Sequence, residues 1–126
     1  MDDQEIEQEI QDKGLTAPRV TPADIEANIA SEHYFTAGQG ALGEHIWGRE
    51  SVDFEKGVWE QKHQIDLLTF CVLVLKNGFT VTGESACASH ENFDAEIGRK
   101  IARQNAVQKL WPLMGYALRN KLAGEA

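Results

Sequence analysis

The sequence lacks long apolar runs and cysteine-rich patterns, and each absence excludes a class of protein. No run of about eighteen or more apolar residues is present, so a membrane span is not predicted. The acidic start, MDDQEIEQEIQDKG, is unlike a secretion signal. Only two cysteines occur, Cys71 and Cys87, in apolar stretches without metal-site spacing. A reducing cytoplasm is therefore the expected compartment.

Basic residues are also too few for a general nucleic-acid binder. The formal net charge is −8, so non-specific DNA binding is not expected. Residues 1–63 carry 5 basic and 14 acidic residues, a net charge of −9, whereas residues 64–126 carry 7 and 6, a net of +1. Between Phe93 and Leu122 there are 6 basic and 2 acidic residues. One cationic segment therefore belongs to an otherwise acidic protein.

The length of 126 residues and the hydrophobic content of 42% predict a single compact domain. We interpret residues 1–21 as an acidic N-terminal arm and connector, in which residues 1–13 form a frayed or partner-dependent helix with weak order, and residues 22–126 as one α+β domain. Thr21 and Pro22 fit the N-cap and the first position of a helix. A short amphipathic helix from Pro22 to about His33 is predicted.

Residues 36–62 hold five of the eleven glycines and have no clear hydrophobic period. With the scattered aromatics Trp47, Phe54 and Trp59, this composition predicts a long loop or an irregular, twisted ribbon. A GxGxxG pattern within residues 38–43 follows no clear strand and opens no clear helix. We interpret it as a chance match in a flexible loop.

The next segment has the pattern of a β-hairpin. Residues Gln64–Leu75 are apolar and β-branched enough for a buried strand, and Asn77-Gly78 is typical of a tight turn. Residues 79–83 then alternate like a returning strand.

The last quarter predicts a long amphipathic helix with Ser89 as its N-cap. Pro112 removes one backbone donor, so a kink or a break into two helices is expected there. The apolar stripe is broad enough to favour an oligomer. We thus predict an α+β, dimer-forming fold in which an antiparallel sheet with a central β-hairpin packs on this helix. The apolar positions are Phe93, Ile97, Ile101, Val107, Leu110, Trp111, Met114, Leu118 and Leu122.

Catalytic and metal-binding patterns are mostly absent. The four histidines lack HxxxH or HxE spacing, and no cysteine joins them in a metal pattern. Cys71 lies in the most apolar run, where a thiol stays protonated. Cys87 is a weak candidate for a nucleophile, because a nearby helix N-terminus would lower the pKa of its thiol. We expect a protein that is not an enzyme and uses no metal or cofactor. A nucleotide hydrolase is the least favoured alternative, and it would need Asp94, Glu96 or His90 as a general base.

The cationic helix is the main candidate for binding. Arg99 and Arg103 lie one turn apart, opposite Ile97 and Ile101, near a helix N-terminus that favours anions. Two arginines in this arrangement suit phosphate oxygens. The alternative interpretation is an ordinary solvated face.

The aromatic and amide residues near this helix also have two interpretations. Phe79 and Phe93 suit either stacking on a base or burial in the core. Asn92 and Asp94 suit either a binding role or stabilisation of the first helical turn.

Several motifs occur in a joint order that resembles a family of small phage proteins. This family is similar to the phage anti-Thoeris sponges, which sequester cyclic ADP-ribose signals. The likeness covers residues 67–122 and is more specific than any single motif. The motifs are NGF at 77–79, SAC at 85–87, ENFD at 91–94, KLW at 109–111 and GY at 115–116.

The resemblance implies a dimer with interlocked C-terminal helices and ligand pockets where the protomers meet. It also implies further assembly and an affinity for cyclic di- or trinucleotides. We therefore predict a phage anti-defence sponge in the host cytoplasm that binds a cyclic nucleotide without cleaving it. The alternative is an acidic protein-interaction module that docks on a host factor, suggested by the acidic first half. The ligand-binding residues carried over from the resemblance are Phe79, Asn92, Arg99, Arg103 and Lys109.

Overall fold

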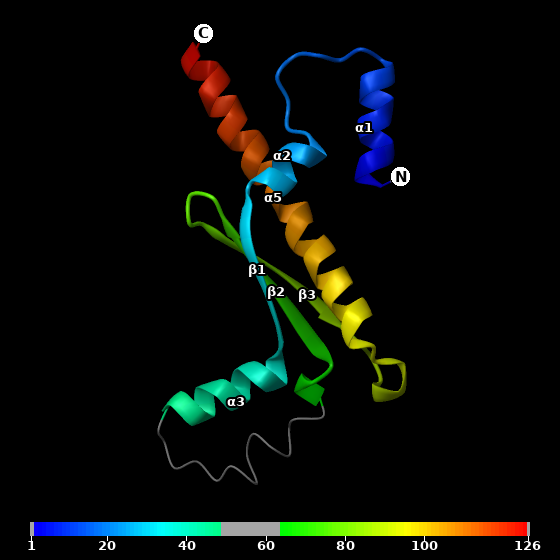
Figure 1. The fold of residues 1–126 in the computed structure, drawn as a ribbon, viewed down its shortest axis with the longest axis vertical. Helices are drawn as coiled ribbons and strands as arrows, with labels where there is room; N and C mark the ends of the chain where they lie inside the picture. Colours follow the sequence, from blue (N-terminus) through cyan, green and yellow to red (C-terminus); the bar gives the residue numbers. More distant parts are fainter. Residues whose placement is uncertain (1, 49–63, 126) are drawn as a thin grey trace.

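A three-stranded antiparallel sheet and one long helix form the body of the protein. The computed structural model describes residues 2–48 and 64–125. The strands lie in the order β1-β2-β3, and helix α5 crosses one face of the sheet (Figure 1). This confirms the predicted α+β fold class. The elements are α1 (Asp3–Asp12), α2 (Pro22–Ala27), β1 (Ile29–Thr36), α3 (Ala37–Gly48), β2 (Leu68–Leu75), β3 (Thr80–Ala86), the 3₁₀ helix η1 (His90–Asn92) and α5 (Ala95–Glu125).

The predicted hairpin is formed by β2 and β3. Gly78 has a φ of 89°, a conformation that glycine adopts without steric cost, and the Asn77 side-chain oxygen accepts the Phe79 amide at 2.9 Å. Strand β2 begins at Leu68 rather than Gln64, because residues 64–67 form a turn first. Alternate residues of β2 are buried against α5, as the period of two requires.

Strand β1 replaces the second half of a predicted helix. Thr21 and Asp24 form a reciprocal capping box with Pro22 at the start of α2, as the sequence indicated. The helix then ends at Ala27, so the prediction that it continues to His33 is wrong. Residues 29–36 instead pair with β2, and the backbone N–H and C=O groups of the two strands form hydrogen bonds with each other.

Helix α3 occupies part of the segment predicted to be a loop. Thr36 and Gln39 exchange hydrogen bonds, since each backbone amide donates to the other's side chain, at 2.9 and 3.1 Å. The expectation of a loop or ribbon is thus wrong for Ala37–Gly48. The GxGxxG pattern lies inside this helix. The rest of that prediction, including Phe54 and Trp59, falls outside the described residues.

Helix α5 starts later and packs differently than predicted. Asp94, not Ser89, caps it, accepting the Ile97 amide at 3.0 Å. The helix continues through Pro112, so the expected break is absent. Ile97 and Ile101 were expected to lie on the buried stripe, but they are 55% and 41% exposed.

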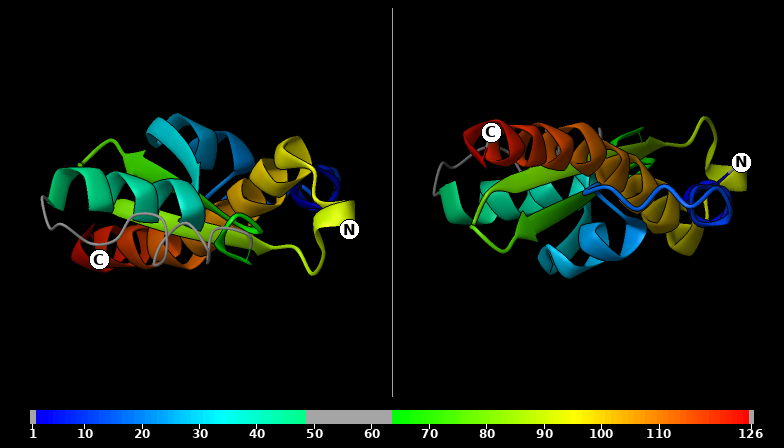
Figure 2. Two further views of the ribbon diagram at one scale, coloured as in Figure 1. Left: turned by 90° about the horizontal axis from the view of Figure 1, so that it is seen from below. Right: turned by 90° about the horizontal axis from the view of Figure 1, so that it is seen from above.

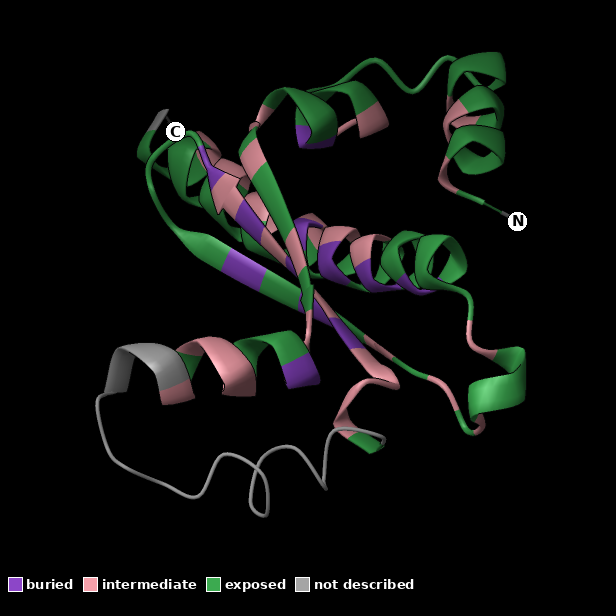
Figure 3. Ribbon diagram, turned by 60° about the horizontal axis from the view of Figure 1, so that its bottom comes forward, coloured by how far each residue is buried: buried purple, intermediate pink, exposed green. Residues whose placement is uncertain are grey.

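Two alanines and a leucine on α5 form the actual contact with the sheet. Ala102, Ala106 and Leu110 are fully buried against it, and Figure 3 shows the resulting buried stripe along the helix. A Cβ atom added at Gly83 of β3 would lie 2.1 Å from the Ala102 carbonyl oxygen. Glycine opposite alanine therefore brings the helix backbone close to the strand.

Residues Asp3–Asp12 of the N-terminal arm form helix α1, and the start of this helix contacts α5. The Trp111 indole donates to the Asp3 carboxylate at 3.1 Å, and Arg19 pairs with Glu7 through two hydrogen bonds. The hydrogen bond from Arg19 lowers the pKa of Glu7 to about 2. Both views in Figure 2 show α1 at the edge of the molecule, and Asp3 at its start contacts α5. No helix within the described ranges is long and apolar enough to cross a membrane.

Candidate functional site

A cavity of about 640 Å³ opens between α3, one end of the sheet and the start of α5. Ligand pockets are typically about 300–1,000 Å³, so the size suits a small organic molecule. Its walls combine aromatic, polar and charged side chains from five elements and the turn before β2. The lining residues are Tyr34, Phe35, Thr36, Gly38, Gln39, Leu42, Asp66, Thr69, His90, Phe93, Ala95 and Arg99.

Two helix N-termini meet at this cavity. Helix α3 contributes Gly38 and Gln39 from its first turn, and α5 contributes Ala95, its first residue. The N-terminal end of a helix carries a partial positive charge, which favours anions. Arg99 adds a full positive charge and makes no ion pair with any residue that the structure describes.

One carboxylate balances the local charge. Asp66 lines the cavity and lies so close to Gly38 that a Cβ there would be 2.0 Å from its oxygen. A carboxylate accepts hydrogen bonds from ribose hydroxyls or from the amino groups of bases. The cavity thus offers a cation for phosphate and an acceptor for a nucleoside.

Aromatic rings form one wall. Phe35 stacks on Phe70 with ring centroids 5.5 Å apart and an interplanar angle of 29°. Phe35 is also 37% exposed and lines the cavity together with Phe93. Exposed aromatic faces of this kind are suited to stacking on a base.

Tyr34 connects the cavity to an ion-paired cluster behind it. Its hydroxyl donates to Glu32 at 2.8 Å, and burial together with this hydrogen bond raises the pKa of Tyr34. Arg103 then joins Glu32, at 3.2 Å, to Glu26 of α2, at 2.7 Å. The hydrogen bond from Arg103 lowers the pKa of Glu26.

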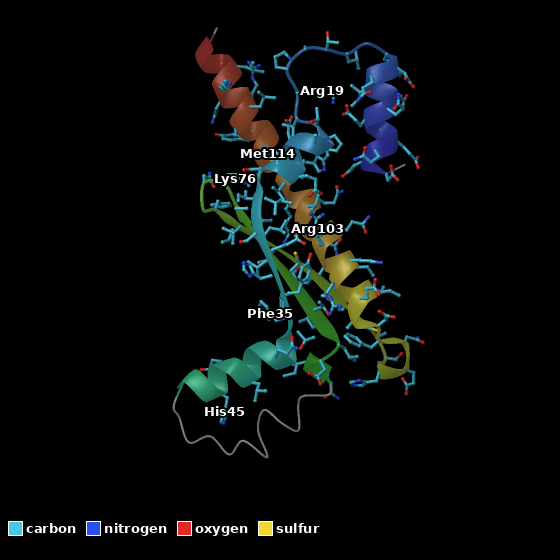
Figure 4. The ribbon with its side chains drawn as sticks, in the orientation of Figure 1. Arg19, Phe35, His45, Lys76, Arg103 and Met114 are labelled. Atoms are coloured by element: carbon cyan, nitrogen blue, oxygen red, sulfur yellow. The ribbon has the colours of Figure 1, made fainter. Side chains whose placement is uncertain are left out.

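The predicted arginines therefore occupy different environments. Arg99 lines the cavity, whereas Arg103 lies outside it and is held by two carboxylates from α2 and β1 (Figure 4). Helix α5 turns by about 100° per residue, so one turn of separation leaves the two side chains on overlapping but distinct faces. Spacing alone did not show that acidic partners surround Arg103.

The other three predicted residues are not gathered at the cavity in one chain. Phe79 is 57% exposed in the hairpin turn, and Figure 4 places the neighbouring Lys76 at the opposite end of the sheet from Phe35. Asn92 is exposed on η1, and Lys109 is exposed on α5. Ligand contact by the five residues stays a prediction.

Sequence reasoning missed the contribution of α3 and of Phe35. The signal that identifies the helix is the capping pattern in which Thr36 precedes Gln39 by three residues. The high glycine content of the following residues obscured it. Without α3, the cavity would lack one wall.

Cys71 has the buried environment that its sequence context indicated. Cys71 is fully buried, and burial raises the pKa of its thiol. The Cys87 sulfur lies 3.2 Å from the Ser89 carbonyl oxygen and donates to it. Among the described residues, no three histidine, cysteine, aspartate or glutamate side chains gather as a metal site.

Comparison with known proteins identifies the family. The sequence model of the Phage protein (N4 Gp49/phage Sf6 gene 66) family matches residues 20–122, more than four fifths of the chain. The chain belongs to this family. The match includes every residue that lines the cavity, whereas helix α1 of this phage protein precedes it. No curated protein sequence and no solved structure matches the chain.

Proposed function

We propose that this phage protein is an anti-defence sponge that binds a cyclic nucleotide immune signal and does not cleave it. The signal is a cyclic ADP-ribose isomer or a cyclic di- or trinucleotide in the host cytoplasm. The observation that carries the proposal is the cavity at which two helix N-termini, the Arg99 cation and the rings of Phe35 and Phe93 converge. The resemblance to anti-Thoeris sponges supports the same ligand class.

Each part of a nucleotide has a matching group in the cavity. Arg99 and the helix N-termini suit phosphate oxygens, and Phe35 and Phe93 suit the face of a base. Asp66 suits a ribose hydroxyl or a base amino group. A sponge requires tight, reversible binding, for which such groups suffice without a nucleophile or a base.

A homodimer would complete the site in this proposal. Phe79 and Asn92 are both exposed, so a second protein chain can reach them. Within one chain the hairpin turn that holds Phe79 and the helix η1 that holds Asn92 lie at opposite ends of the sheet (Figure 1). A hairpin turn from a second copy must therefore bring Phe79 toward Asn92 and Arg99. Exposed apolar side chains on α5, including Tyr116 at 70%, provide a surface for that contact.

Calorimetric titration with cyclic ADP-ribose isomers and a set of cyclic di- and trinucleotides tests the proposal. The ligand is then released by heat and analysed by chromatography. We expect tight binding by one ligand and its recovery intact. Recovery of a cleaved product would identify an enzyme instead. Binding of none of these ligands would refute the sponge and favour the acidic interaction module.

Two variants of adjacent residues test the position of the site. Arg99→Ala is expected to weaken binding about 10- to 100-fold, because it removes charge-assisted hydrogen bonds to phosphate. Lys100→Ala removes the same charge from a residue that is outside the cavity and paired with Glu96 at the surface. Equal affinities of the two variants would show that the ligand does not occupy this cavity.

A further inference from the structure

The cavity wall contains a buried hydroxyl group without a partner. Thr69 is 3% exposed, and its Oγ1 atom forms no hydrogen bond with the described residues. The same residue lines the cavity. Burying a hydroxyl without a hydrogen bond destabilises a fold, whereas valine fills nearly the same volume without that penalty. Packing alone therefore gives no reason for threonine at this position.

The strand register shows where this hydroxyl lies. Thr69 of β2 is directly opposite Thr36 of β1 and Ser85 of β3, so three hydroxyl residues form a row across the sheet. The start of α5 covers the row at Gly98, where an added Cβ would lie 3.0 Å from the Thr69 Oγ1 atom. Glycine at this position leaves the hydroxyl its space between the sheet and the helix.

We propose that Thr69 is a ligand-reading residue of this cavity, whose hydroxyl forms a hydrogen bond with the bound nucleotide. This inference rests on the proposed function. The Oγ1 atom lies near Gly98, and a 120° rotation about the Cα–Cβ bond moves it to another staggered position. In this proposal, that rotation turns Oγ1 toward the cavity that the residue lines. A hydroxyl both donates and accepts, so it suits a ribose hydroxyl or a phosphate oxygen.

The proposal predicts opposite effects of one substitution on stability and on binding. Thr69→Val removes the unpartnered hydroxyl, so the ligand-free protein is expected to melt a few degrees higher. The same variant is expected to bind the nucleotide about tenfold more weakly, because it loses one hydrogen bond. A residue with a purely structural role would not change stability and affinity in opposite directions.

Two further variants complete the experiment, which uses thermal melting and calorimetric titration of the full chain. Thr69→Ser keeps the hydroxyl and is expected to bind within about twofold of the wild type. Thr80→Val removes a hydroxyl from an exposed position of β3, outside the cavity, and is expected to leave affinity unchanged. If Thr69→Val binds the nucleotide as tightly as the wild type does, the inference is wrong.

The outcomes separate this inference from the proposed function. Binding by the wild type with equal affinity in Thr69→Val refutes only the role of Thr69. An absence of nucleotide binding by the wild type refutes both. Tight binding, together with a higher melting temperature and weaker binding in Thr69→Val, supports both.

Discussion

Substituting Gly83 tests how closely α5 lies on the sheet. In Gly83→Ala, the new Cβ would meet the Ala102 carbonyl oxygen at 2.1 Å and the Ala106 amide nitrogen at 2.3 Å. Both are backbone atoms of α5, so no side-chain rotation relieves the overlap. The helix must move away by more than 1 Å to reach an ordinary contact of 3.4 Å.

The cost of this movement follows from what the helix buries. Ala102, Ala106 and Leu110 have no solvent exposure, so a shift of α5 loosens the centre of the core. Overpacking typically costs about 1–3 kcal/mol, and a clash with backbone belongs at the upper end. We expect the free energy of unfolding to fall by about 3 kcal/mol and the melting temperature by about 10 °C.

Urea denaturation followed by tryptophan fluorescence measures the change, with Gly115→Ala as the matched control. Gly115 lies on α5, the helix that Gly83 contacts, and a Cβ added at Gly115 meets nothing within 4 Å. Alanine should therefore stabilise the helix by about 0.5–1 kcal/mol. A Gly83→Ala variant within about 0.5 kcal/mol of the wild type would refute the close packing of α5 on β3.

Two further predictions concern ion pairs. Arg103→Ala should lower the free energy of unfolding by about 1–2 kcal/mol, since it leaves Glu26 and Glu32 unpaired, and partial exposure keeps the cost below that of a buried pair. Unchanged stability in urea would contradict this. The carboxyl carbon of Glu7 should titrate by NMR near pH 2, and at a clearly higher pH in Arg19→Ala, where the hydrogen bond from Gln11 remains. The stabilisation from this ion pair is complete above pH 4.5 and is lost as the pH falls through about 2. Equal titration midpoints of Glu7 in the wild type and in Arg19→Ala would exclude this ion pair.

The elements that the sequence predicted well have signals in neighbouring residues. Asn77-Gly78 specifies a tight turn because glycine tolerates a positive φ, and the apolar run before it requires burial. The capping box at Thr21 and Pro22 likewise depends on atoms a few residues apart. These local interactions form in the same way whatever surrounds them.

The errors concern segments whose structure depends on distant partners. Residues 29–36 form a strand because β2 offers hydrogen-bonding groups, and helix propensity does not outweigh that pairing. Ile97 and Ile101 are exposed because Gly83 selects the small-residue face of α5 for the sheet. Hydrophobicity alone ranked isoleucine above alanine for burial.

The sequence by itself determined the hairpin, the long C-terminal helix and the α+β class, because turn chemistry and hydrophobic period are local properties. It also identified Arg99 as a candidate for anion binding. Only the tertiary structure distinguished Arg99 in the cavity from Arg103 among carboxylates, and only it placed α3 and Thr69 beside Arg99. The physical reason is that a binding site depends on which side chains long-range packing brings together, and spacing along one helix does not record the residues opposite it.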